Sequence, residues 1–280
     1  GAGKEYIIMA KDLSICMITK NESDKLDHSL SAIKEAFSDN TPEIVVVDTG
    51  SSDNSVEVAK KYTDKVFFHE WNDDFASAKN SAIDHASNDN ILLLDTDEYI
   101  TESDIKSIDD FFLNGNRNAL GLIKRTNHFF TNGEERTGIE WIPRLFSRKE
   151  FRYEGKIHEQ LVSLSKKPVL RKRVFLTIDH DGYNLSEEGI RKKADRNIAL
   201  LEKEEKTPYI LYQLGKSYYY KGDHNTAADR FSEALYFDLD ERLDYVKDMV
   251  VSYGYSLINS GRLEEALSLS PNMTSRRPVD

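Results

Sequence analysis

Residues 91–98 read Ile-Leu-Leu-Leu-Asp-Thr-Asp-Glu, an apolar run that ends in two aspartates two positions apart, Asp95 and Asp97. Such a run is typical of a buried strand, and the aspartates then leave the sheet at the strand's carboxyl end. Paired carboxylates of this kind can hold Mg²⁺ or Mn²⁺, which complete their coordination with substrate phosphates and water. Taken alone, the same residues would also suit a helix N-cap in a solvated loop.

Two further strand ends carry polar residues. The apolar run Ile44–Val47 leads into Asp48 and a glycine turn, and the run 13–19 is followed by Lys20-Asn21-Glu22. In parallel α/β sheets, ligands bind outside the carboxyl ends of the strands, so we expect the three strand ends to form one polar site. Asp48 could instead be only a turn residue that closes its strand.

The chain around these strand ends alternates between short apolar runs and amphipathic stretches. The apolar runs lie at 13–19, 43–47, 65–68 and 90–94, and helical spacing of apolar residues is found at 24–37, 54–62 and 74–85. This alternation predicts an α/β fold with a mostly parallel sheet and right-handed crossovers. A helix is expected from about Glu102 to Phe112, and the strand-like stretch 119–178 is expected to form the acceptor half of the same domain.

The pattern becomes wholly helical from Ser186 onward. With Pro208 as position 1, the large, small and aromatic residues match the spacing of a tetratricopeptide repeat. The matching residues are Leu211, Leu214, Gly215, Tyr218, Ala227, Phe231 and Ala234. A weaker copy runs from Tyr253 to Ala266. We therefore predict two domains, residues 1–185 and residues 186–280, the second being a small all-α repeat module.

Composition narrows the class of protein. The 280 residues include 38 Lys or Arg and 49 Asp or Glu, and the net charge of −11 argues against a surface for nucleic acid. No apolar run approaches the roughly 18 residues of a membrane helix, so we expect no membrane span and a cytoplasmic location. The single cysteine, Cys16, is expected to be a buried small hydrophobe. Neither a Gly-X-Gly-X-X-Gly segment nor a P-loop motif is present, which disfavours those nucleotide-binding classes.

Four segments together resemble a known family. They are Thr19–Glu22, Val47–Ser55, Phe75–Asn80 and Leu94–Glu98. In this order they resemble the family 2 glycosyltransferases with the GT-A fold, over about residues 13–185. The chain looks most similar to the branch with a C-terminal tetratricopeptide extension, which includes the sublancin-type peptide S-glycosyltransferases. The resemblance implies a Rossmann-like GT-A domain that binds a nucleotide-sugar, followed by the helical module.

The resemblance also implies roles for donor-binding residues. Asp48 would hydrogen-bond the nucleotide base, with Thr19 and Glu22 enclosing the base and the ribose. Asp53 would stabilise that loop or touch the ribose. Lys79 would reach toward the nucleotide and its diphosphate, although it could instead be a solvated lysine on a helix.

Asp95 and Asp97 correspond to the Asp-X-Asp motif of the family. The resemblance implies that Asp97 binds Mn²⁺ or Mg²⁺ directly and that Asp95 contacts the ribose. His180, which closes an expected strand, is implied as a further metal ligand, although a lone histidine can equally be structural. The metal would stabilise the charge that develops on the leaving diphosphate.

An inverting enzyme of this family also uses a general base, which deprotonates the attacking hydroxyl or thiol. The candidates in the second half of the domain are Glu140, Glu159, Asp179 and Asp181. We favour Glu159 as the catalytic base, because the segment Tyr153–Gln160 resembles a motif of the tetratricopeptide-bearing branch. Glu159 could alternatively be an ion-paired surface residue.

These features predict inverting transfer of a sugar from a nucleotide-sugar, by family habit a UDP-sugar, to a peptide or protein held by the repeats. An alternative acceptor is an envelope glycan or a lipid-linked saccharide. A non-catalytic repeat scaffold is a third hypothesis, and the retention of Asp48, Asp95 and Asp97 argues against it. Nucleotidyltransferases also use paired carboxylates and are a minor alternative. The exposed end of the repeats could pair with a second chain to form a homo-oligomer.

Overall fold

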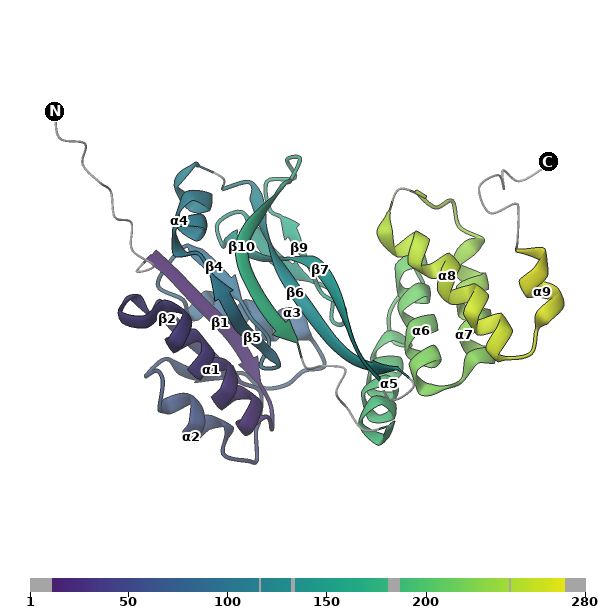
Figure 1. The fold of residues 1–280 in the computed structure, drawn as a ribbon, viewed down its shortest axis with the longest axis horizontal. Coiled ribbons are helices and arrows are strands. Elements are labelled where there is room, and N and C mark those ends of the chain that lie inside the picture. The colour runs from purple at the N-terminus through teal and green to yellow at the C-terminus, as the bar shows by residue number, and fades with distance from the viewer. Residues whose placement is uncertain (1–11, 116, 132–133, 181–186, 242, 270–280) are drawn as a thin grey trace. The chain divides into compact units, whose positions relative to one another are not determined.

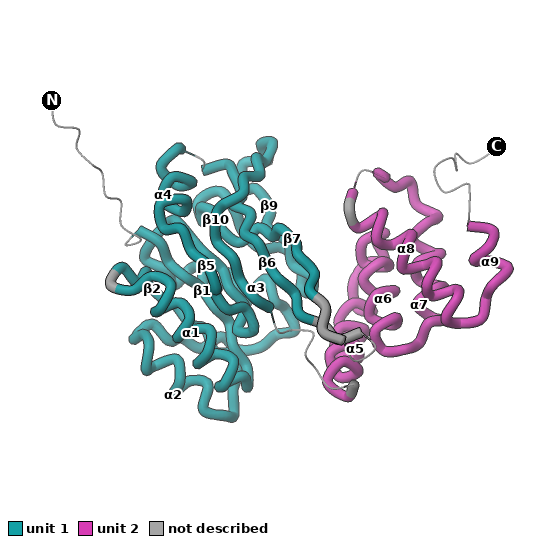
Figure 2. The backbone as a smooth tube through the Cα atoms, viewed as in Figure 1, with its two compact units in different colours: residues 1–184 teal, residues 185–280 magenta. Residues whose placement is uncertain are grey.

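The computed structural model describes residues 12–115, 117–131, 134–180, 187–241 and 243–269. The chain divides into two compact units, residues 1–184 and residues 185–280, which Figure 2 colours separately. The boundary predicted between residues 185 and 186 falls within 181–186, outside the described residues.

The first unit is built on an eight-stranded sheet with the strand order β3-β2-β1-β4-β7-β6-β10-β5. Its first four strands in chain order are β1 (Leu13–Thr19), β2 (Glu43–Asp48), β3 (Val66–Phe68) and β4 (Asn90–Leu93). All pairings among these four are parallel, as the alternating pattern predicted. Their side chains are mostly buried on both faces, which is why they read as continuous apolar runs in the sequence.

Helices cover both faces of this parallel part of the sheet (Figure 1). Helix α1 (Ser23–Phe37) buries Leu26, Leu30, Ile33 and Phe37 against one face, a spacing that places all four on one side of the helix. Helix α3 (Phe75–His85) packs on the other face, where Cys16 of β1 is fully buried. The Asp74 side chain caps α3 by accepting a hydrogen bond from the Ser77 N–H at 2.8 Å. Short helices η2 (Ser38–Asn40) and α2 (Ser55–Lys60) complete the connections.

The second half of the sheet is mixed. Strands β6 (Ala119–Thr131) and β7 (Glu134–Ser147) form a long antiparallel pair, and β7 joins β4. Strand β10 (Leu170–His180) lies between β6 and β5 (Glu98–Ser103). Strands β8 (Phe151–Glu154) and β9 (Gln160–Ser163) form a second, two-stranded sheet.

One predicted helix begins later than expected. The segment Glu98–Ser103 is strand β5, and helix α4 (Ile105–Leu113) starts only after Asp104, which caps it. Residues 98–103 become a strand because they pair with β10, more than 70 residues further along the chain. The pattern of apolar residues in so short a segment cannot predict that it pairs with a strand so far along the chain.

The regular elements in the described residues of the second unit are helices: α5 (Glu187–Leu201), α6 (Pro208–Lys221), α7 (His224–Leu235), α8 (Asp244–Asn259) and α9 (Leu263–Ser268). Gly215 permits the close approach of α6 and α7, because a Cβ atom there would lie 2.5 Å from Cε1 of Phe231. None of the helices in the described part of the chain is both long and apolar enough to cross a bilayer.

Candidate active site

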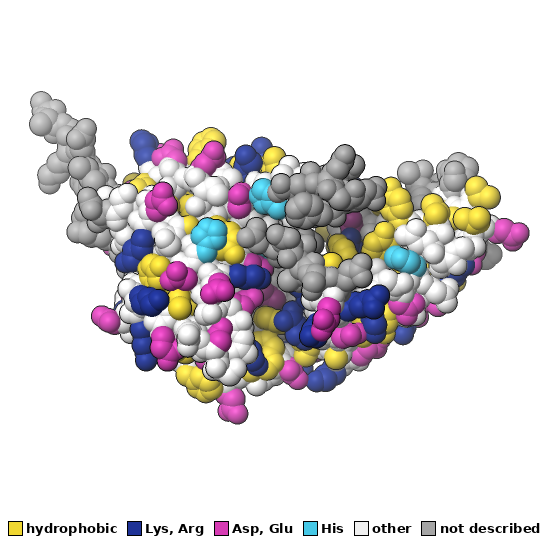
Figure 3. Space-filling model, turned by 60° about the horizontal axis from the view of Figure 1, so that its bottom comes forward, with side chains coloured by type: hydrophobic (Ala, Val, Ile, Leu, Met, Phe, Trp, Pro, Cys, Tyr) yellow, Lys and Arg dark blue, Asp and Glu magenta, His cyan; other side chains and the backbone are white. Residues whose placement is uncertain are grey.

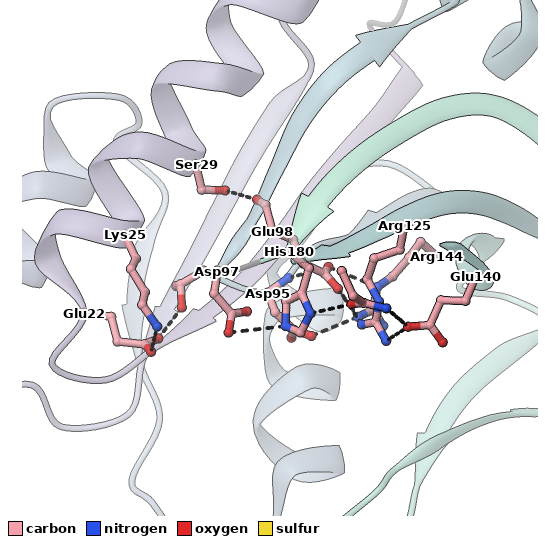
Figure 4. Close-up of polar contacts among 12 residues, drawn as sticks. Glu22, Lys25, Ser29, Asp95, Asp97, Glu98, Arg125, Glu140, Arg144 and His180 are labelled. Carbon is pink, nitrogen blue, oxygen red and sulfur yellow. Dashed lines mark hydrogen bonds and ion pairs between the residues drawn. The ribbon is translucent and has the colours of Figure 1, made fainter. Parts of the chain in front are cut away.

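The carboxyl ends of the parallel strands meet at one edge of the sheet. Thr19 and Asp48 are register partners at the ends of β1 and β2, and the Thr49 N–H donates to the Thr19 carbonyl at 3.0 Å. Asp95 and Asp97 follow at the end of β4, in the turn that leads into β5. Because β1 pairs in parallel with both β2 and β4, the three strand ends lie at the same edge of the sheet. Figure 4 shows Glu22, Asp95 and Asp97 at this edge.

Asp48 is engaged by its own loop. Its carboxylate accepts hydrogen bonds from the N–H groups of Gly50 at 2.9 Å and Ser51 at 3.0 Å. Gly50 has φ of +102°, a conformation that favours glycine, so the turn after β2 depends on this residue. Asp48 therefore shapes a loop of backbone groups at the strand end.

Asp53 ties that loop to helix α1. One carboxylate oxygen accepts the Ser23 N–H at 3.1 Å, at the start of α1, and the other accepts the Ser55 N–H at 2.9 Å. The hydrogen bond from the Ser55 hydroxyl is the main reason that the pKa of Asp53 lies below its ordinary value. Asn21, with φ of +55°, completes the join by accepting the Ser52 N–H at 2.7 Å. Through these contacts Asp53 holds the loop against the start of α1.

Glu22 and Thr19, which were also predicted to bind the nucleotide-sugar, lie beside this loop. The Thr96 hydroxyl donates to Glu22, which also lies 3.7 Å from the Lys25 ammonium. The Thr19 hydroxyl is buried and has no hydrogen-bond partner among the residues that the structure describes. The hydrogen-bonding capacity of this hydroxyl is therefore unused within the described residues.

Asp95 is clamped by two cations. Lys79 Nζ lies 2.9 Å from one of its carboxylate oxygens, and Arg144 Nη2 lies 2.9 Å from the other. Burial alone would raise the pKa of Asp95, but these two positive charges outweigh it and hold that pKa well below its ordinary value. Asp95 is therefore ionised and fixed in place at neutral pH.

Glu98 is a site residue that sequence reasoning missed. Its side chain is fully buried, and it contacts Arg144 Nη2 at 2.6 Å and Arg125 Nη1 at 3.1 Å. It also accepts the Asp95 N–H at 3.1 Å, so it fixes the backbone of the motif. The available signal was its place directly after the second aspartate, since a carboxylate in a buried strand requires cations nearby.

Asp97 and His180 come together, as predicted, with Asp97 Oδ2 3.5 Å from His180 Nε2. Burial would raise the pKa of Asp97, and the hydrogen bond with His180 more than offsets this, so the pKa is lowered. The histidine is oriented from behind by Asn127, whose Oδ1 lies 2.8 Å from His180 Nδ1. Asn127 in turn donates through its amide nitrogen to Glu140 at 2.6 Å.

This chain of contacts defines the orientation of the histidine ring. Glu140 can only accept, so the Asn127 amide nitrogen must face it and the amide oxygen must face His180. His180 Nδ1 therefore donates to the Asn127 oxygen, and Nε2 is the ring nitrogen that faces Asp97. Ligating histidines in metal sites are held from behind in this way. Sheet register produces the arrangement, because His180 pairs with Asn127 across β10 and β6, and Arg125 pairs with Glu140 across β6 and β7.

Among the described residues, no group of three or more His, Cys, Asp or Glu side chains is arranged to hold a metal ion. Asp97 and His180 supply two ligands of the right chemistry. Mg²⁺ and Mn²⁺ often take only one or two protein ligands and fill the remaining positions with water and substrate phosphate. The donor set fits such an ion.

The predicted base, Glu159, faces the same cluster. Its Oε1 lies 2.6 Å from Lys79 Nζ, which therefore bridges Glu159 and Asp95. Burial would lower the pKa of Lys79, but the two carboxylates outweigh it and raise that pKa. The other candidates differ: Glu140 is occupied by Arg125 and Asn127, and Asp179 pairs with His128 at 3.3 Å. Asp181 lies outside the described residues.

The model of the family described as glycosyl transferase family 2 matches residues 14–165, more than half of the chain. The chain belongs to glycosyl transferase family 2. The strands and loops that carry Thr19, Asp48, Asp95 and Glu159 all lie within the matched residues, and His180 lies beyond them. Its sheet is the mostly parallel sheet of the GT-A fold, with helices on both faces.

Several proteins of known name are similar to this family 2 chain. The SPbeta prophage-derived glycosyltransferase SunS of Bacillus subtilis (strain 168) is 27% identical over 240 residues, which cover 78% of this chain and 52% of that protein. A TPR repeat-containing protein of Synechococcus elongatus is 40% identical over 86 residues, 31% of this chain and 20% of its own. The crystal structure of S. aureus TarS 1-349 in complex with UDP aligns with a TM-score of 0.41 at 17% identity, over 92% of this chain and 87% of that one. The chain spans about half the length of the curated glycosyltransferase SunS that it matches.

The surface of this family 2 chain carries charges of both signs. Over the described residues of the face drawn in Figure 3, Lys and Arg side chains are interspersed with Asp and Glu. The cationic groups that matter for the site, Lys79 and Arg144, are instead buried beneath the surface.

Proposed function

We propose that this protein transfers a sugar from a nucleotide-sugar, most simply a UDP-sugar, to an acceptor nucleophile with inversion at the anomeric carbon. The observation that carries the proposal is the convergence of Asp48, Asp95, Asp97 and His180 at one edge of a family 2 domain. That edge combines a hydrogen-bonding loop, a candidate metal pair and buried cations, which are the parts that nucleotide-sugar chemistry requires.

The nucleotide would bind where β1 and β2 end. The loop built on Asp48 presents backbone groups for a base, and the buried Thr19 hydroxyl has an unused hydrogen bond to offer. Glu22 and Asp53 hold the surrounding turns in place through Thr96 and Ser23. Preference for uridine rests on the family resemblance.

Asp97 and His180 would hold Mn²⁺ or Mg²⁺ through one carboxylate and one imidazole. When bound, such an ion would neutralise the charge that builds up on the departing diphosphate. Asn127 and Glu140 keep His180 Nε2 directed toward Asp97. Lys79 and Arg144 would keep Asp95 ionised and fixed beside the bound donor.

Glu159 would act as the general base. The acceptor O–H or S–H would attack the anomeric carbon, the bond from that carbon to the phosphate oxygen would break, and the acceptor proton would pass to the Glu159 carboxylate. The ion pair with Lys79 orients Glu159 before the reaction. The diphosphate leaves with the bonding electrons.

The first experiment measures nucleoside diphosphate release from UDP-, GDP- and dTDP-sugars, with Mn²⁺ or Mg²⁺ and with EDTA. Slow hydrolysis of the donor needs no acceptor, so the assay can begin before the acceptor is known. We expect metal-dependent release from one donor. Absence of both release and nucleotide binding would overturn the proposal and favour a repeat scaffold.

We further propose a peptide or protein acceptor. The support is the repeat-like helical unit, because stacked helix pairs create extended surfaces of the kind that bind peptides. The second candidate, a glycan or lipid-linked saccharide, is tested in the same assay. Acceleration of diphosphate release by peptides but not by saccharides would support the first, and the reverse result would support the second.

A further inference from the structure

Tyr153 is a buried tyrosine in the candidate active site. It is not part of the Asp-X-Asp motif and has no role in the proposed mechanism. It belongs to β8 and is 5% exposed. Lys79 Nζ lies 5.4 Å from the centroid of its ring, and Phe146 packs edge-on against the ring with centroids 6.0 Å apart. Among the described residues, the Tyr153 hydroxyl has no hydrogen-bond partner.

A buried tyrosine hydroxyl without a partner is uncommon, because burial removes water and a native fold normally supplies a replacement bond. The backbone of Tyr153 is held on both sides by Asn80. The Tyr153 N–H donates to Asn80 Oδ1 at 3.0 Å, and Asn80 Nδ2 donates to the Tyr153 carbonyl at 2.9 Å. The residue is therefore fixed against α3 with its hydroxyl unsatisfied.

The charges around the hydroxyl locate it in the site. It lies within electrostatic range of Arg144, Lys79, Asp95 and Glu159, and burial is the largest cause of a raised pKa. Tyr153 is therefore neutral at physiological pH, and its hydroxyl can donate one hydrogen bond and accept others. It is a neutral group beside Lys79, the cation that bridges Asp95 and the proposed base Glu159.

We propose that the Tyr153 hydroxyl binds a hydroxyl group of the sugar that is transferred, and so contributes to sugar recognition. This inference rests on the proposed function. Lys79 and Arg144 are already paired with carboxylates, whereas the Tyr153 hydroxyl is neutral and unpaired among the described residues. A sugar hydroxyl matches a neutral group that both donates and accepts. The sugar is also the part of the donor that must lie between the nucleotide and the base.

The test compares wild-type protein with Tyr153→Phe, which removes one oxygen and keeps the ring that packs on Phe146. Dissociation constants are measured for UDP and for the UDP-sugar that the wild type hydrolyses fastest. We expect the variant to bind that UDP-sugar about tenfold more weakly, the effect of one lost neutral hydrogen bond. We expect UDP affinity to be unchanged and the thermal midpoint of the ligand-free protein to be unchanged or higher, because an unsatisfied buried oxygen has been removed.

Tyr62→Phe is the matched control. The Tyr62 hydroxyl donates to Asp27 Oδ1 at 3.0 Å, so its loss should lower the thermal midpoint without changing either affinity. A lower midpoint with unchanged affinities in Tyr153→Phe would show a purely structural role, such as binding an internal water, and would overturn the proposal. Equal losses for UDP and the UDP-sugar would assign the hydroxyl to the diphosphate and overturn it as well. Failure of the wild type to bind either ligand is a separate result, which would overturn the proposed function together with this inference.

Discussion

Asp48 and Asp95 both lie at the carboxyl end of a parallel strand, yet their carboxylates have different kinds of partner. Asp48 is satisfied by backbone N–H groups two and three positions ahead of it. Asp95 is satisfied by side chains of other elements, including Arg144, 49 positions away. The first region is a local turn, and the second is a buried network of charges. The same residue type thus shapes a binding loop in one place and anchors an ionic cluster in the other.

The largest expected effect comes from breaking the network at Arg144. Arg144→Gln leaves Glu98 fully buried with less positive charge, and removing one partner of a buried ion pair costs about 3–5 kcal/mol. The free energy of unfolding in urea measures this. Lys106→Gln is the control, because its pair with Asp110 is exposed, and we expect no measurable change there. A loss for Arg144→Gln as small as that of the control would contradict a buried network.

The next largest effect is expected at Asp97, where a substitution should reduce activity without reducing stability. Asp97 contacts His180 but is not clamped by arginines, so Asp97→Asn should fold normally. We expect metal-dependent release of diphosphate to fall at least about 100-fold, because the ion would lose its anionic ligand. Asp110→Asn, on the exposed face of α4, should release diphosphate at the wild-type rate. Full activity in Asp97→Asn would rule out the metal assignment.

Acid should weaken the network. The pKa of Asp95 is lowered in the folded protein, so its contribution is present above the pKa of an unfolded aspartate, about 3.9, and is lost as pH falls through the folded value. We expect the free energy of unfolding to drop as the pH is lowered below about 4. Urea titrations at several pH values should show a shallower drop for Asp95→Asn than for the wild type. Identical slopes would mean that Asp95 is not held ionised by Lys79 and Arg144.

The smallest expected effect on stability is at Asp48. Asp48→Asn keeps one oxygen to accept from Gly50 or Ser51, so the free energy of unfolding should change by less than about 1 kcal/mol. Nucleotide affinity should fall all the same, because the amide has one acceptor oxygen where the carboxylate has two, and the second would accept from the nucleotide base. Isothermal titration with UDP measures this affinity. A larger loss of stability here than in Asp95→Asn would reverse the comparison between the two regions.

Much of the fold was predictable because its signals are local. Strands β1 and β2 are apolar β-branched runs, and α1 repeats its buried residues at helical spacing, so the α/β class followed from short windows of sequence. Strand β5 was not recognised, because its pairing with β10 lies far along the chain. Glu98 was missed for the same reason, since a carboxylate in so short a strand gives no local sign of two arginine partners.

The sequence by itself determined the parallel α/β core, the polar strand ends of Asp48 and Asp95, and the family to which the chain belongs. Only the tertiary structure decided how the charges pair. Sheet register set His180 beside Asn127 and Arg125 beside Glu140, and packing of α3 placed Lys79 between Asp95 and Glu159. Local pattern reflects the propensity and burial of neighbouring residues, whereas register depends on contacts between strands that are distant in the chain.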